Sequence, residues 1–161
     1  TRLQRKTIPL AVVVAAEHLT AILAAAILRG DLMADAHSEL LELWRWHAIE
    51  ELEHKAVAFD VYAAYGGGTN LRRLMMVYIV GVLSLRMAAR MTEMLHRDGK
   101  LFAASTWRAA GRFLVGERGL MRSLAAEFWE FFRADFHPWD NDNSALIRAH
   151  DTGRAAAAAA S

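Results

Sequence analysis

Long apolar segments, separated by glycine-rich or polar breaks, dominate the chain. Residues 8–28 are almost wholly apolar, with Thr7 and Pro9 where a helix would begin and Gly30 where it would stop. A second, long helix is predicted from residue 31 or 35 to about residue 65, where three consecutive glycines follow. The first half of the chain therefore predicts two helices.

The second half predicts further helices with short connections. Thr69 or Asn70 can cap a third helix that runs to about residue 97, with Gly99 beyond it. Residues 105–133 have a helical pattern that is broken around residues 116–119, residues 137–140 turn the chain, and Ser144 can cap a short last helix. No stretch shows sustained strand alternation. We therefore expect an all-α fold, an antiparallel helical bundle of ferritin-like character that need not be complete in this chain.

Length and composition limit the classes of protein. The chain has 161 residues, which suits one helical domain over residues 1–150, followed by a tail at 151–161 whose alanine run is typical of a disordered or artefactual segment. The sequence has no cysteine, which excludes disulfides, thiolate metal sites and a cysteine nucleophile. A net charge of +1 gives no reason to expect a nucleic-acid partner.

Charge is unevenly distributed along the chain. Residues 31–60 hold eight acidic and two basic side chains, whereas residues 71–122 hold ten basic and three acidic ones. One interpretation is two helical surfaces that neutralise each other, and the other is a basic rim that attracts an anionic substrate or a lipid headgroup.

Membrane insertion is the alternative explanation for the apolar segments. Residues 8–28 are long enough to span a bilayer, but Glu17 and His18 lie in their middle, and residues 74–85 are too short. A helix buried inside a bundle explains the same composition, so we do not expect membrane association. No signal peptide is visible, and we expect a cytoplasmic protein.

The strongest chemical signal lies in the second predicted helix. Because each helical residue turns about 100°, His47, Glu51 and His54 fall on one narrow stripe. Glu51 and His54 form a Glu-x-x-His pair, the arrangement that projects metal ligands into the core of di-iron and di-manganese carboxylate bundles. His47 is placed one turn earlier, either as a further ligand or as a partner of Glu51. We therefore expect a metal centre here.

Glu17 supports the same interpretation. It is a lone acid inside the apolar first helix, where a carboxylate requires a partner. A metal ion shared with Glu51 and His54 would supply that partner. The three residues amount to one half of the ligand set of a dinuclear carboxylate centre.

The source of the other half is open. Glu93 with His96 repeats the Glu-x-x-His spacing near a helix end, where solvent exposure is expected, and Glu127 and Glu130 could complete the count. A second copy of the chain, or an N-terminal region outside this sequence, are the alternatives. The plain alternative to any metal is an ion-paired network, whose members would be Glu50, Glu51, Glu53, His47, His54 and Lys55.

Three segments carry a resemblance to a known family: residues 16–21, 43–62 and 136–139, which read AEHLTA, LWRWHAIEELEHKAVAFDVY and FHPW. They resemble the bacterial predicted metal-dependent hydrolases over nearly the whole chain, to about residue 149. Members of that family are longer at the N-terminus and carry there a Glu-x-x-His-x-x-x-His motif that this sequence lacks. The resemblance thus implies that this chain corresponds to the C-terminal part, with the other ligands in the missing region.

Two enzyme classes and one non-enzymatic class follow. In a hydrolase, one or two metal ions would activate water and Glu50 could act as general base. In a di-iron oxygenase or oxidase, the centre would activate dioxygen for a small, apolar organic substrate. Metal storage or a helical interaction module is the non-enzymatic alternative. Glu and His ligands suit iron, manganese and zinc, with iron our first choice.

Three further residues receive smaller roles. Lys55 is placed to neutralise Glu51 or a neighbouring acid. Asp60 is a candidate to orient His47 or His54. His137 could reach the centre, although a turn that packs Trp139 is the simpler expectation.

Overall fold

The computed structural model describes residues 4–33, 35–117 and 119–159, and helices account for most of them. The helices are α1 (Gln4–Arg29), α2 (Ser38–His54), α3 (Val57–Ala64), α4 (Thr69–Arg97), α5 (Ala104–Val115), α6 (Leu120–Glu130), the 3₁₀ turn η1 (Pro138–Asp140) and α7 (Ser144–Ala159). No strand occurs among these residues. The all-α prediction is confirmed, whereas the ferritin-like character and the division into a domain at 1–150 and a tail stay predictions.

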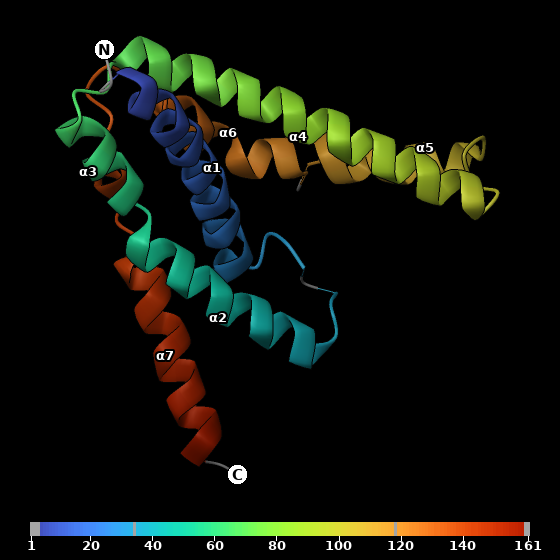
Figure 1. The fold of residues 1–161 in the computed structure, drawn as a ribbon. Helices are drawn as coiled ribbons and strands as arrows, with labels where there is room; N and C mark the ends of the chain where they lie inside the picture. Colours follow the sequence, from blue (N-terminus) through green and yellow to red (C-terminus); the bar gives the residue numbers. More distant parts are fainter. Residues whose placement is uncertain (1–3, 34, 118, 160–161) are drawn as a thin grey trace.

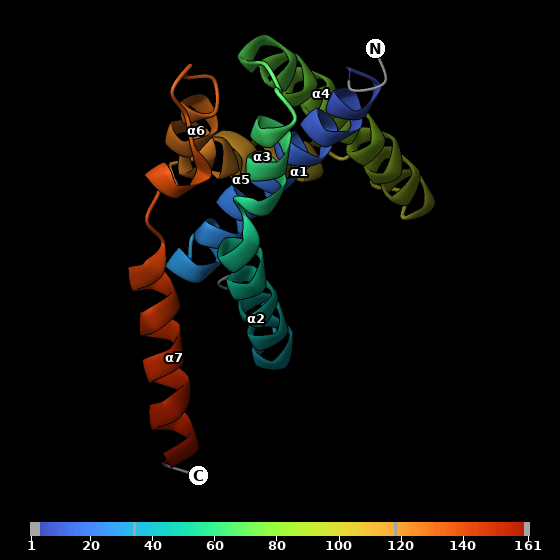
Figure 2. The same cartoon turned by 60° about the vertical axis from the view of Figure 1, so that its left-hand side comes forward.

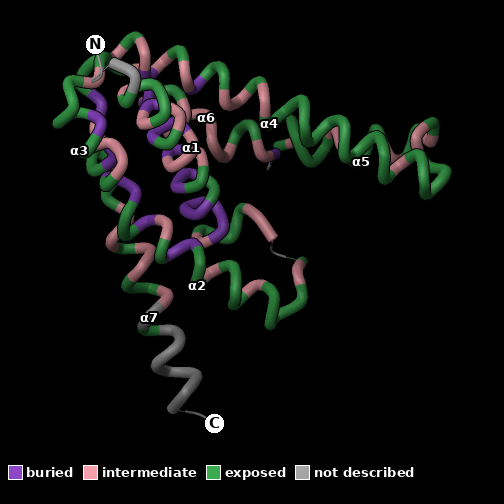
Figure 3. Tube along the Cα trace, in the orientation of Figure 1, coloured by how far each residue is buried: buried purple, intermediate pink, exposed green. Residues whose placement is uncertain are grey.

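α1 is the central helix of the fold. It contacts α2, α3, α4, α6 and α7, and Figure 1 shows these helices arranged around it. Much of its surface is alanine, which lets neighbouring helices approach closely. Purple, buried positions accordingly follow α1 along its length in Figure 3.

Two apolar clusters lie along α1. Towards its start, Ala11, Val14 and Ala15 pack with Tyr62, and the same cluster includes Met76, Phe131 and Phe136. Towards its end, alanines of α1 pack with Ala48 and Leu52 of α2. α3 and α4 thus pack on the first part of α1, and α2 on the second part.

Glycines end three helices as the sequence predicts. Gly30, Gly66 and Gly99 follow α1, α3 and α4, and all three have positive φ values, between 66° and 80°. L-residues with a Cβ rarely adopt this conformation.

The predicted caps differ from the structure. α4 begins with Thr69 as its first helical residue, after an N-cap at Gly68 that makes no side-chain cap bond. α7 likewise begins with Ser144 inside the helix and has 16 residues rather than being short, and α1 begins at Gln4, before the predicted Thr7.

The second predicted helix is the main correction. It starts at Ser38 rather than at residue 31 or 35, and it breaks at Lys55 and Ala56, so that α2 and α3 are separate helices. Lys55 is buried, and its ammonium group donates to the Asn141 carbonyl at 2.5 Å and to Asn143 Oδ1 at 2.6 Å. The break lets α2 pack on one apolar cluster and α3 on the other (Figure 2).

Two helices meet the length and composition of a membrane span. In α1, 56% of the most apolar window is buried inside the molecule, as expected of a core helix. In α4 the corresponding share is 6%. The two helices are therefore alike in sequence but differ in their surroundings.

Candidate metal site

The packing of α1 against α2 brings three of the predicted ligands together. Each of Glu17, Glu51 and His54 offers a carboxylate oxygen or imidazole nitrogen, and these three atoms all lie within 4.8 Å of one another. Glu51 and His54 share a face because they are three residues apart on a helix. Glu17 and Glu51 are half-buried, and His54 is exposed. The cluster therefore opens to solvent on the His54 side.

Glu17 has an unsatisfied carboxylate oxygen. Its Oε2 is buried and has no hydrogen-bond partner among the described residues. The nearby Thr20 hydroxyl donates to the backbone carbonyl of Glu17 and not to its carboxylate. A buried acceptor without a donor is costly, and a cation at this position would satisfy it.

His47 lies beside the cluster but is not one of its three members. Its Nε2 is 3.4 Å from Glu51 Oε1, one helical turn away, and 49% of its side chain is exposed. The Trp44 ring contacts the imidazole edge-on, with the ring centroids 5.7 Å apart. The two roles of His47, as a further ligand and as a partner of Glu51, both stay predictions.

The ion-paired network is mostly absent from the described part of the chain. Of its six members, only His47 and Glu51 lie within ion-pair distance of each other there, and Lys55 is directed elsewhere. Glu50 and Glu53 are exposed on α2. The structure does not bring Glu50 into the three-residue cluster, so its role as general base stays a prediction.

The candidates for the other half of the ligand set lie elsewhere. Glu93 is exposed on α4 and is held by Arg90 at 3.0 Å and Arg97 at 2.7 Å. Glu127 pairs with Arg29 at 2.7 Å, and Glu130 accepts a hydrogen bond from Asn141 at 2.7 Å. These carboxylates already have partners, and His96 is exposed. Among the described residues, the cluster of possible metal ligands therefore consists of Glu17, Glu51 and His54.

The sequence profile of one family, described as predicted metal-dependent hydrolase, matches residues 1–142. The chain belongs to the family of predicted metal-dependent hydrolases. The match includes all three members of the cluster, which accords with a metal-dependent family. Among curated proteins and among solved structures, nothing matches the chain.

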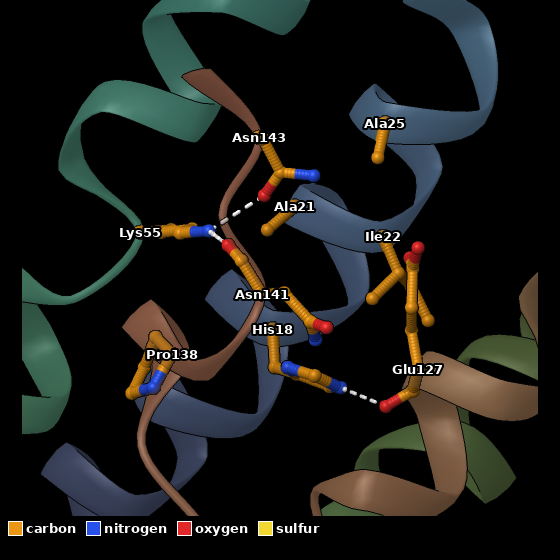
Figure 4. Close-up of a pocket in the computed structure, with 9 residues that line it drawn as sticks. All are labelled: His18, Ala21, Ile22, Ala25, Lys55, Glu127, Pro138, Asn141 and Asn143. Carbon is orange, nitrogen blue, oxygen red and sulfur yellow. Dashed lines mark hydrogen bonds between the residues drawn. The ribbon is translucent and has the colours of Figure 1, made fainter. Parts of the chain in front are cut away.

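The chain also has a buried polar region that the sequence interpretation missed (Figure 4). A cavity of about 20 Å³ lies between α1, the end of α2 and the segment at 138–143, with His18, Lys55, Glu127 and two asparagines among its lining residues. It has room for about one water molecule. Lys55 points to Asn141 and Asn143 across it, and not to Glu51 as predicted.

His18 occupies the opposite side of this cavity. It is buried between Phe131 and Phe136, with ring centroids at 4.7 Å and 5.1 Å. Its pKa is lowered to about 4, chiefly by burial and in smaller part by the positive charges of Arg72 and Lys55, while the hydrogen bond to the Glu127 carbonyl acts in the opposite direction. His18 is thus neutral, and its Nε2–H donates to that carbonyl at 3.1 Å. The sequence feature that could have revealed this buried polar region is a histidine inside an apolar helix.

Asp60 and His137 pair with each other rather than with the cluster. The Nε2 of His137 is 3.0 Å from Asp60 Oδ1, and its Nδ1 accepts a hydrogen bond from the Trp139 amide at 3.2 Å. Both imidazole nitrogens therefore serve to hold the turn at η1. Asp60 therefore does not orient His47 or His54. His137 does not reach the cluster and instead stabilises the turn, which was the simpler of its two predicted roles.

Proposed function

We propose that Glu17, Glu51 and His54 bind a divalent metal ion and that the chain acts as a metal-dependent hydrolase. The observation that carries the proposal is the buried, unpartnered Oε2 of Glu17 next to two further donors. Two carboxylates can balance the two positive charges of the ion, and neutral imidazole is a common third ligand. The family description supports the same activity.

The chain's own residues would divide the work around the ion. A bound divalent ion supplies Lewis-acid activation of water and of the scissile group. His47 would hold the Glu51 carboxylate through its Nε2, which lies 3.4 Å from Oε1. Glu50, exposed beside Glu51 in the sequence, is our candidate to accept a proton at its carboxylate.

The substrate would approach from the open side of the cluster. His54 is exposed, and Leu43, one turn before His47 on the same face of α2, is exposed as well. Leu43 lies about 12 Å along α2 from Glu51, so our choice is a small organic substrate whose apolar part extends toward it. Iron is our first choice of metal, and manganese and zinc are compatible with the same ligands.

A dinuclear, oxygen-activating centre is the second candidate. Two carboxylates with one histidine form half of the ligand set of ferritin-like di-iron proteins, and the open side leaves room for a second set. The number and identity of the bound ions distinguish this candidate from a hydrolase.

The test is metal content per chain after reconstitution with Fe²⁺, Mn²⁺ or Zn²⁺, measured by elemental analysis. We expect Glu51→Gln and His54→Gln to weaken metal binding by more than about tenfold, because each removes a ligand. Glu53→Gln, on the same helix, and His96→Gln are matched controls, since both residues are exposed and outside the cluster.

The outcomes separate the candidates. Metal-dependent cleavage of model esters, amides or phosphoesters, lost in Glu51→Gln and kept in Glu53→Gln, is the expected result for the hydrolase. Two irons per chain with oxygen consumption would move the assignment to the second candidate. Equal metal content in all variants, or none in the unmodified chain with any of the three cations, would overturn the proposed site.

A further inference from the structure

The outer half of α4 and the whole of α5 form an arm, residues 83–115, which extends away from α1, α2 and α3 and contacts α6 (Figure 1). α4 packs on the core through Arg72 and Met76, both in its first half. None of the twelve residues of α5 is buried. Green, exposed positions accordingly dominate this arm in Figure 3.

The arm exposes large apolar side chains in a helical pattern. The face of α4 that carries Met76 continues along Met87, Met91 and Met94, which lie beyond the reach of the core and are exposed. Phe102, in the turn between the two helices, is 93% exposed. On α5, Trp107 and Phe113 are also exposed. Such an accumulation of unpartnered apolar side chains marks an interaction surface.

Basic side chains accompany this apolar surface. The arm holds six basic and two acidic residues, a net charge of +4. Glu93, one of the two acids, is already paired with Arg90 and Arg97. Arg108 and Arg112 fall on one side of α5, whereas Trp107 and Phe113 fall on the other. Apolar and basic faces side by side are typical of helices that lie in the interface of an anionic membrane.

We infer that the arm docks on an anionic lipid surface, with its helices in the plane of the interface, in departure from our expectation from the sequence that the chain does not associate with membranes. A membrane-spanning orientation is disfavoured because the uncharged segment of α4, residues 74–85, has 12 residues and covers about 18 Å of a hydrocarbon core of about 30 Å. A symmetric contact between the arms of two copies is disfavoured because it would place two surfaces of net charge +4 together. The inference does not depend on the metal site.

The experiment is co-sedimentation of the full chain with vesicles of phosphatidylcholine alone or with about 30% phosphatidylglycerol. We expect binding to the anionic vesicles, little binding to the neutral ones, and release as NaCl is raised from about 50 to about 500 mM. Phe102→Ser should weaken the partitioning about tenfold through lost apolar contact. The double variant Arg108→Glu, Arg112→Glu should weaken it at least about tenfold through charge reversal.

Matched controls lie outside the arm. Leu43→Ser replaces an exposed apolar side chain on α2, and Arg148→Glu reverses an exposed charge on α7. Both should bind vesicles like the unmodified chain. Equal binding by the arm variants and the controls, equal binding to neutral and anionic vesicles, or no binding at all would overturn the inference. So would a dimer, measured by light scattering without lipid, that Phe102→Ser dissociates, since the arm would then contact a second copy.

Discussion

His18 and Glu17 are neighbours in the sequence, but the polar groups of their side chains are accommodated differently inside the protein. The imidazole of His18 is neutral, packed between two phenylalanines and hydrogen-bonded to a backbone carbonyl. The carboxylate of Glu17 has one oxygen without a partner in the described structure. Polar residues inside an apolar helix were recognisable from the sequence, but their different environments depend on α2 and α6 and were not.

The neutral state of His18 predicts a pH dependence of stability. Its folded-state pKa of about 4 lies below the ordinary histidine pKa of 6.5, so the unfolded chain binds the proton more readily. The contribution that neutral His18 makes to the free energy of unfolding at pH 7 is therefore lost as the pH falls from 6.5 toward 4. Between pH 7 and pH 5 we expect a loss of about 2 kcal/mol in the free energy of unfolding.

Urea unfolding of the chelator-treated protein across this pH range measures the effect. His18→Gln should flatten the pH dependence between pH 7 and pH 5, whereas His96→Gln, which alters an exposed histidine, should leave it unchanged. The same slope in both variants would show that another group causes the loss.

A glycine is required at position 67 because the Tyr62 ring packs directly against its backbone. A Cβ built there would lie 2.4 Å from ring atoms of Tyr62, which is buried and whose hydroxyl donates to the Gly68 carbonyl at 2.7 Å. The ring cannot move aside without losing that bond, so Gly67→Ala should lower the free energy of unfolding by about 1–3 kcal/mol. Gly68→Ala is the control, since a Cβ there meets nothing within 4 Å and φ is −94°. Equal losses in denaturant titrations of the two variants would contradict this explanation.

At the scale of whole helices, the predictions succeeded where the signal is local. Gly30 and Gly99 end α1 and α4 with positive φ values that a neighbouring segment need not impose. The break at Lys55 was missed, because it depends on Asn141 and Asn143, which are 86 and 88 residues away. Nothing in the periodicity around Lys55 contains that information.

Lys55 therefore carries a prediction for the elements that it joins. Lys55→Met removes the donor of two hydrogen bonds and leaves the Asn141 carbonyl without its charged partner, at a cost of about 1–3 kcal/mol in unfolding free energy. We also expect faster hydrogen exchange at the Leu146 and Ile147 amides, which bond to the Asn143 carbonyl. Lys6→Met, at an exposed position of α1, is the control, and indistinguishable behaviour of the two variants would contradict this role.

At the scale of the molecule, the cluster joins the central helix to α2. Its three members were predictable because a helical stripe and a lone acid in an apolar helix are sequence features. The fates of Glu127 and Glu130 were not, because Arg29 and Asn141 bind them from other segments. Sequence spacing ranks possible ligands, but only packing determines which carboxylates remain free.

A bound ion should therefore stabilise the whole fold through Glu17. In the chelated protein, Glu17→Gln removes a buried charge whose Oε2 has no partner, so we expect unchanged or higher thermal stability. With metal at about 100 times its Kd, the unmodified chain should gain about 2.7 kcal/mol, and Glu17→Gln should gain little. Calorimetry with and without metal measures both effects, and Glu53→Gln should gain as the unmodified chain does. If Glu17→Gln is instead less stable without metal and gains as much from it, Glu17 has a structural role and the ion binds elsewhere. The sign of the change in thermal stability that Glu17→Gln causes without metal thus distinguishes two cases. In one, Glu17 is a metal ligand that lowers the stability of the metal-free fold, and in the other the fold itself requires Glu17.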